Sequence, residues 1–90
     1  MEENVSKLGK KRYNEPIKIQ SKRFGFFPKT FLWHGRRYSI KRVERAWTIS
    51  KQRPRRRVER RCFRVHTAEG IFDLYQDLVA NTWYLEKMIA

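Results

Sequence analysis

The chain has 90 residues, and its 22 Lys and Arg against 9 Asp and Glu give a formal net charge of +13 at pH 7. This length accommodates one small domain and excludes a second; with 40% hydrophobic and 14% aromatic residues, wholesale disorder is excluded as well. The large positive charge predicts an acidic partner.

Residues 1–15 are polar, with only isolated apolar positions. We expect a flexible basic arm over 1–15, followed by a single all-β domain over 16–90. At the start of that domain, Ile17 and Ile19 alternate with polar residues, which is typical of a half-buried strand.

Two alternating runs, 31–33 and 36–40, flank the dipeptide His34-Gly35. Both residues can supply the positive φ angles of a two-residue turn, so the pattern predicts a tight hairpin. The second run continues to about Ser50, which is too long for a straight strand in a domain of this size. Its apolar phase shifts around 41–42, which predicts a β-bulge and a bend.

Residues 51–61 contain seven Lys and Arg and a single apolar residue. Because no hydrophobic alternation is visible, we expect a long basic loop here. Alternation returns in 63–67 and 71–76, which predicts a second hairpin, and a last strand is expected over 83–89.

Five or six short antiparallel strands with one long bent strand favour a sheet that curls on itself. The expected fold is a small antiparallel barrel or a strongly bent five- to six-stranded meander, SH3-like or OB-like. Closure or dimerisation has to cover Trp33, Trp47 and Trp83, because exposing all three would promote association. We therefore expect a monomer or a weak dimer.

Residues that could support catalysis are sparse: His34, His66, Cys62, Asp73 and Asp77. They show no recognised catalytic or zinc-ligand spacing. Asp73 and Asp77 could share one side of a strand, as magnesium ligands do, but Asp at a strand end more often begins a turn. We expect no enzymatic activity, no cofactor and no metal.

Cys62 is the only cysteine, so an intramolecular disulfide is impossible, which suits a reducing compartment. The longest apolar run is three residues, far below the roughly 20 that a spanning helix needs. We expect a cytoplasmic protein that does not enter a membrane.

The density of arginine favours nucleic acid as the polyanion, because the planar guanidinium group suits bidentate phosphate contacts. An acidic protein surface, or no specific partner, are the alternatives. Six residues of the basic segment are the first candidates for binding: Arg53, Arg55, Arg56, Arg57, Arg60 and Arg61. A second candidate surface comes from the hairpin and bent strand: Arg36, Arg37, Lys41 and Arg42. The pattern does not separate DNA from RNA, or single from double strands.

Residues 31–89 contain five short motifs, each of which occurs once: F-x-W-x-G-R-x-Y from Phe31, V-x-x-x-W from Val43, F-R-V-x-T from Phe63, G-x-F-x-L-Y-x-D from Gly70 and W-Y-L-E from Trp83. In these motifs the chain resembles a family of short bacterial proteins described as a domain of unknown function. The resemblance implies a role near polymerase-like proteins of mutagenic DNA repair. It leaves two functions open: binding of nucleic acid in repair or replication, or a non-catalytic adaptor subunit of a repair complex.

Overall fold

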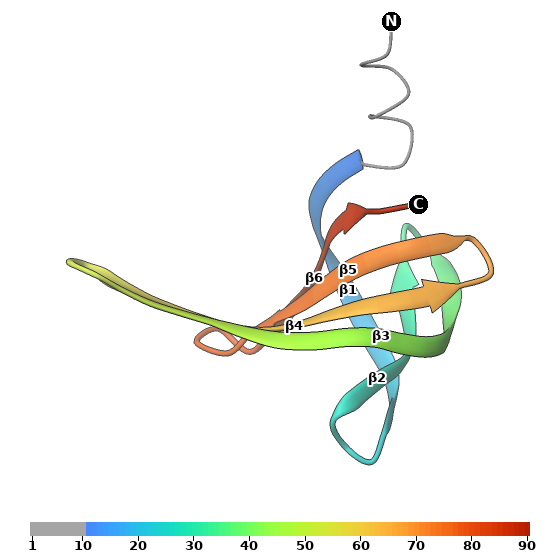
Figure 1. Cartoon of the computed structure of the whole chain (residues 1–90), viewed down its shortest axis with the longest axis horizontal. Coiled ribbons are helices and arrows are strands. Elements are labelled where there is room, and N and C mark those ends of the chain that lie inside the picture. The colour runs from blue at the N-terminus through green and yellow to red at the C-terminus, as the bar shows by residue number, and fades with distance from the viewer. Residues whose placement is uncertain (1–10) are drawn as a thin grey trace, which may run out of the picture.

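A computed structural model of the protein describes residues 11–90. Its six strands are each antiparallel to the next, and pairing of the first with the last closes the sheet into a barrel (Figure 1). The strands are β1 (Lys11–Arg23), β2 (Phe27–Trp33), β3 (Arg36–Arg53), β4 (Arg56–Thr67), β5 (Gly70–Asp77) and β6 (Thr82–Met88). The expected all-β fold is confirmed. Residues 11–90 contain no helix long and apolar enough to cross a membrane.

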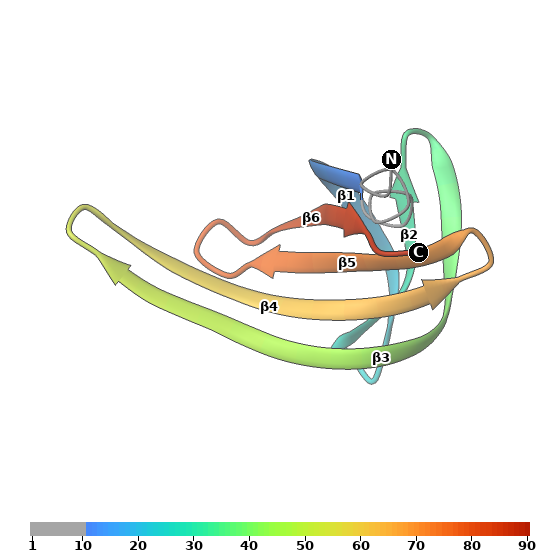
Figure 2. The ribbon, with the colours of Figure 1, turned by 45° about the horizontal axis from the view of Figure 1, so that its top comes forward.

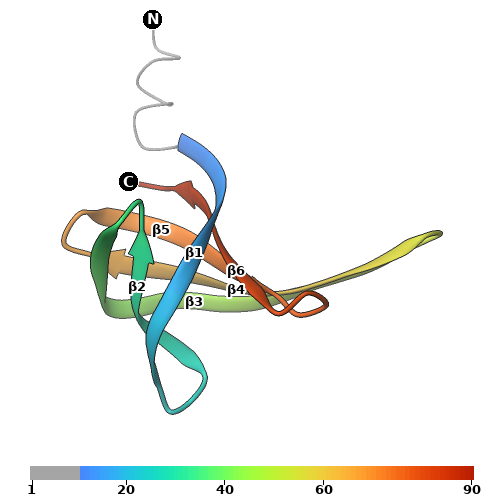
Figure 3. The same ribbon diagram turned by 180° about the vertical axis from the view of Figure 1, so that it is seen from behind.

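The core lies inside the barrel because successive side chains of a strand point to opposite faces. On β4, Phe63 and Val65 are fully buried among the core side chains, whereas Arg64 between them lies on the outer face. From behind, β1 runs between β2 and β6 and completes the wall (Figure 3). The core cluster is Phe31, Trp33, Tyr38, Ile40, Phe63, Val65, Phe72, Leu74 and Leu85.

The turn between β2 and β3 is the expected two-residue hairpin. His34 and Gly35 have φ angles of 54° and 73°, and two successive positive φ angles match the strand twist in such turns. The hairpin aligns Trp33 with Arg36.

Strand β3 bends, as its change of apolar phase predicted. Its pairing with β4 shifts register between Ile40 and Arg42, and again between Val43 and Arg45. The first shift confirms the bulge; the second was not anticipated. Extra residues on one strand of a pair increase its local bend, and Figure 2 shows β3 curving from β2 into the long hairpin with β4.

The expectation of a flexible arm over 1–15 is wrong for 11–15, which belong to β1; residues 1–10 lie outside the described part of the chain. Arg12 pairs with Lys87 in the ladder between β1 and β6. The isolated apolar residue of this stretch, Tyr13, packs edge-on against Trp33 with ring centroids 4.8 Å apart. An aromatic contact, the strand ladder and polar contacts of Arg12 and Glu15 hold the segment, and none of these produces visible hydrophobic alternation.

The expected loop at 51–61 is also wrong. Strand β3 continues to Arg53 and β4 begins at Arg56, so Pro54 and Arg55 alone form the turn. The pairing is continuous from Trp47 opposite Cys62 to Arg53 opposite Arg56. Backbone ladder bonds need no apolar side chain, so a strand of charged residues leaves no hydrophobic period to detect.

Candidate nucleic-acid interface

The outer part of the β3–β4 hairpin leaves the barrel as a two-stranded ribbon. The ladder between β4 and β5 begins at Arg60, opposite Asp77, so Ser50–Glu59 pair only with each other. We call Ser50–Glu59 the ribbon. Figure 1 shows the hairpin projecting well past the other strands. Each strand contributes four residues to the ribbon, Ser50–Arg53 and Arg56–Glu59, and four residues span about 13 Å at the usual rise of about 3.3 Å per residue.

Positive charge is concentrated on the ribbon, which carries five cations: Lys51, Arg53, Arg55, Arg56 and Arg57. All five are exposed. Arg53 and Arg56 lie directly opposite each other across the two strands, and like charges in that position repel. An anionic ligand would relieve this repulsion.

One carboxylate lies at the base of the ribbon. Glu59 Oε1 is 3.8 Å from Arg57 Nε, which is a long and exposed ion pair. The Glu59 carbonyl accepts a hydrogen bond from the Leu78 amide at 2.9 Å. The β5–β6 turn therefore supports the ribbon where it leaves the barrel.

Arg60 and Arg61 lie where the ribbon meets the barrel, and successive strand residues point to opposite faces. The Arg60 guanidinium carbon lies 4.3 Å from the ring centroid of Tyr75, and that of Arg61 lies 4.5 Å from Phe26. These are cation–π distances. The two arginines therefore lie on opposite faces of the ribbon base, and each stacks on an aromatic ring of the barrel or its turns.

The second predicted surface is separate from the ribbon and is itself divided. Arg36 and Arg37 begin β3 at the end of the molecule away from the ribbon tip (Figure 1). Arg36 Nη2 donates to Glu69 Oε2 at 3.2 Å. Lys41 and Arg42 instead line a groove between β2 and β3. The structure thus distributes the ten predicted residues over the ribbon, its base, the start of β3 and the groove.

Two charged residues that the sequence did not single out, Arg23 and Lys29, line the same groove as Lys41, Arg42 and Arg45. They come from β1 and β2, and the other three come from β3, so no local motif could have found them. Phe24, in the turn between β1 and β2, is 88% exposed.

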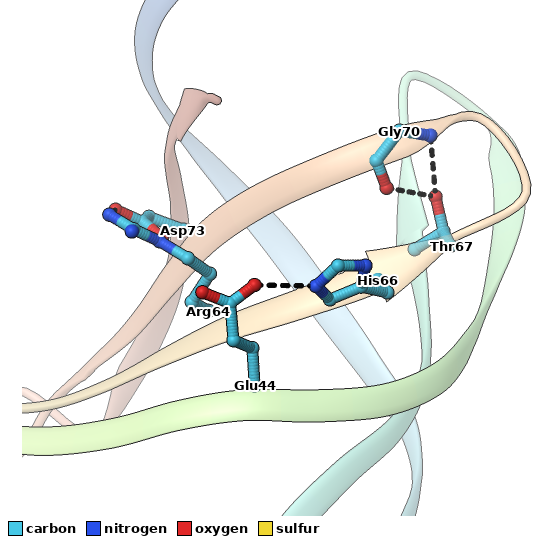
Figure 4. Close-up of polar contacts among 6 residues, drawn as sticks. All are labelled: Glu44, Arg64, His66, Thr67, Gly70 and Asp73. Atoms are coloured by element: carbon cyan, nitrogen blue, oxygen red, sulfur yellow. Dashed lines mark hydrogen bonds and ion pairs between the residues drawn. The ribbon is translucent and has the colours of Figure 1, made fainter. Parts of the chain in front are cut away.

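Arg64 differs from the ribbon arginines because it forms an ion pair with a buried carboxylate of the barrel. Its Nε and Nη2 atoms donate to the two oxygens of Asp73 at 2.8 and 3.1 Å, and Asp73 is 2% exposed. The hydrogen bond with Asp73 raises the pKa of Arg64. Figure 4 shows the pair beside Glu44 and His66. Because this guanidinium group already has a carboxylate, Arg64 is not available as a phosphate contact.

The two histidines each contact one glutamate. His34 Nε2 is 2.6 Å from Glu15 Oε1, and His66 Nε2 is 2.6 Å from Glu44 Oε1. Glu15 also accepts a 2.9 Å hydrogen bond from Trp33 Nε1, and this bond, followed by that with His34, lowers the pKa of Glu15.

The remaining titratable candidates have local roles. Asp77 Oδ1 accepts hydrogen bonds from the amides of Val79 and Ala80 at 3.0 and 3.1 Å, which is the turn role that its position indicated. Cys62 is 2% exposed, and desolvation raises the pKa of its thiol to about 11. Within residues 11–90, no three His, Cys, Asp or Glu side chains are grouped as metal ligands.

Comparison with known families gives one match. The model of a family described as a domain of unknown function, DUF6504, matches residues 3–88. No curated protein and no solved structure matches the chain.

Proposed function

The chain belongs to the DUF6504 family, whose description assigns no activity, and we propose that this protein binds nucleic acid through the ribbon, chiefly by phosphate contacts. The observation that carries the proposal is the ribbon itself: five exposed cations on two strands that no third strand covers.

The shape of the ribbon supports this function. The major groove of B-form DNA is about 12 Å wide and admits a two-stranded β-ribbon. The strands of the ribbon are about 13 Å long at the usual strand rise, which is comparable with the width of that groove. Arginine can contact a phosphate with two parallel hydrogen bonds, and four of the five ribbon cations are arginines.

We further propose that the nucleic acid is DNA. A role near polymerase-like proteins of mutagenic DNA repair in bacteria, as the resemblance implied, would make the ligand DNA met in repair or replication. The single, buried cysteine suits a reducing cytoplasm. The alternative function, a protein-interaction adaptor, involves a different part of the molecule.

The direct test is fluorescence anisotropy with labelled single-stranded DNA, duplex DNA and single-stranded RNA. Five phosphate contacts predict a slope of about −4.5 for log affinity against log salt on duplex DNA. The variant Arg55→Glu with Arg56→Glu should bind at least tenfold more weakly and reduce the steepness of the slope by about two. Arg57 is left in place so that its ion pair with Glu59 persists.

The matched control is Lys11→Glu with Lys18→Glu, which changes the net charge equally. Both lysines are exposed on β1, outside the ribbon. The control should retain most of the affinity. Equal losses in both double variants would show that net charge, and not the ribbon, determines binding. Absence of binding to all three oligonucleotides at low salt would refute the proposal.

A further inference from the structure

The barrel wall is open between β2 and the bent part of β3. The two strands pair only from Thr30 opposite Ser39 to Trp33 opposite Arg36. Beyond Ser39, β3 follows β4 through its two bulges, while Phe27 and Pro28 stay paired with β1. In the part of the chain that the structure describes, two strand edges therefore face each other without a ladder between them.

A groove of about 370 Å³ occupies this opening. One wall consists of the consecutive residues 40–46 of β3, and the opposite wall includes 27–29 of β2. Alternate residues of a strand share a face, so a wall built from consecutive residues follows the strand edge. The edge exposes backbone N–H and C=O groups that lack strand partners, as edges that accept another strand do.

The groove has an apolar lining within a basic rim. The apolar residues are Phe27, Pro28, Ile40, Val43 and Ala46, and the cations are Arg23, Lys29, Lys41, Arg42 and Arg45. Within residues 11–90 none of these five cations forms an ion pair with a carboxylate. The charge of the rim favours an acidic occupant.

The one carboxylate of the lining is already engaged. Glu44 Oε1 lies 2.6 Å from His66 Nε2 (Figure 4), and the hydrogen bond with His66 lowers the pKa of Glu44. The carboxylate contacts His66 on β4 and forms no ion pair with a cation of the rim.

We propose that this groove binds an extended acidic segment of a partner protein, which adds as a strand to the open edge of β3. An added strand satisfies both the N–H donors and the C=O acceptors of an edge. A DNA backbone provides phosphate acceptors but no donors for the carbonyl groups, and the 2′-hydroxyl groups of RNA are not spaced as the N–H groups of a strand. In the bound segment, apolar side chains contact Ile40 and Val43, and alternating carboxylates contact Lys41 and Arg42.

The interaction does not rest on nucleic-acid binding, because the groove and the ribbon use different residues. Two double variants separate them. Lys41→Glu with Arg42→Glu reverses the rim at exposed positions, and Arg55→Glu with Arg56→Glu changes the ribbon alone. Thermal unfolding of both variants establishes that the barrel persists.

The probe is a library of random twelve-residue peptides displayed on phage and selected against the full chain. The enriched peptides are expected to alternate apolar residues with Asp or Glu. A fluorescein-labelled copy of the most enriched peptide should lose at least tenfold in affinity for Lys41→Glu/Arg42→Glu, and less than twofold for Arg55→Glu/Arg56→Glu.

Four results would overturn the proposal: no enrichment, enrichment of peptides without acidic residues, equal binding to both double variants, or the same peptide affinity when its acidic residues are replaced by Asn and Gln. If no peptide is enriched and Lys41→Glu/Arg42→Glu instead weakens oligonucleotide binding, the groove belongs to the nucleic-acid surface. None of these outcomes decides whether the ribbon binds nucleic acid, since that is read from the oligonucleotide titration of the ribbon variant.

Discussion

At the scale of single residues, the fold assigns opposite roles to basic side chains that look alike in the sequence. Arg64 is fixed by two hydrogen bonds to the buried Asp73, whereas Arg55 and Arg56 lie exposed on the ribbon. The difference follows from register, because Arg64 lies opposite Asp73 in the ladder between β4 and β5. The guanidinium group of Arg64 therefore contributes to the stability of the fold, whereas those of Arg55 and Arg56 are available for binding.

Replacing Arg64 alone should destabilise the protein. Arg64→Met leaves the Asp73 carboxylate buried without a partner, and removal of one member of a buried pair typically costs about 3 kcal/mol or more. We expect a fall of about 3 kcal/mol in the free energy of unfolding, measured by chemical denaturation. The combined variant Arg64→Met with Asp73→Leu should recover most of it. If the double variant is as unstable as Arg64→Met, the loss comes from packing and not from the unpaired carboxylate.

Glu15 should make stability depend on pH. The hydrogen bond from Trp33, followed by that with His34, lowers the pKa of Glu15 in the folded state below its usual value of 4.5. A lowered folded pKa stabilises the protein above that value, and this stability is lost as the pH falls through the folded pKa. The wild type should therefore lose more stability than Glu15→Gln when denaturation is measured at pH about 5 and then about 2. Identical losses would contradict this role of Glu15.

At the scale of elements, β3 connects the two candidate binding regions. Residues 40–46 line the groove, and the strand enters the ribbon at Ser50. Both regions exist because the β3–β4 hairpin is longer than the strands beside it: β2 pairs with β3 only as far as Ser39, and β5 pairs with β4 only from Arg60.

The ribbon should be dispensable for folding. It contains no residue of the core cluster, and it carries the like-charge pair Arg53 and Arg56. Replacing residues 51–58 by an Asn-Gly turn should shift Tm by only a few degrees, since a two-stranded hairpin without a third strand is marginally stable by itself. The shortened protein should lose detectable oligonucleotide binding. Unfolding on shortening would mean that the ribbon supports the barrel, and unchanged binding would place the nucleic acid elsewhere.

At the scale of the whole molecule, the sequence predicts those strands and turns that are marked by a local alternation of apolar and polar residues. The His34-Gly35 hairpin and the first bulge of β3 were predictable because apolar residues mark the strand phase on either side. The ribbon was not predictable, because its residues show almost no hydrophobic alternation. Their pairing continues the β3–β4 ladder that begins in the barrel. The ten candidate cations were visible as charge, but their division among four places depends on register between distant strands.

The groove was even less predictable from the local sequence than the ribbon. Its cations come from β1, β2 and β3, and only the failure of β2 and β3 to pair beyond Ser39 brings them around one opening. Composition indicated an acidic partner for the molecule as a whole, while the arrangement of strands separates two surfaces of different chemistry.

The most direct measurement of the central claim is amide chemical-shift mapping of the full chain during titration with a duplex oligonucleotide. The account predicts that the largest shift changes cluster in Ser50–Glu59 and its base at Arg60 and Arg61, and that they diminish as salt is added. Shift changes centred on other residues, with the ribbon amides unmoved at saturation, would contradict it.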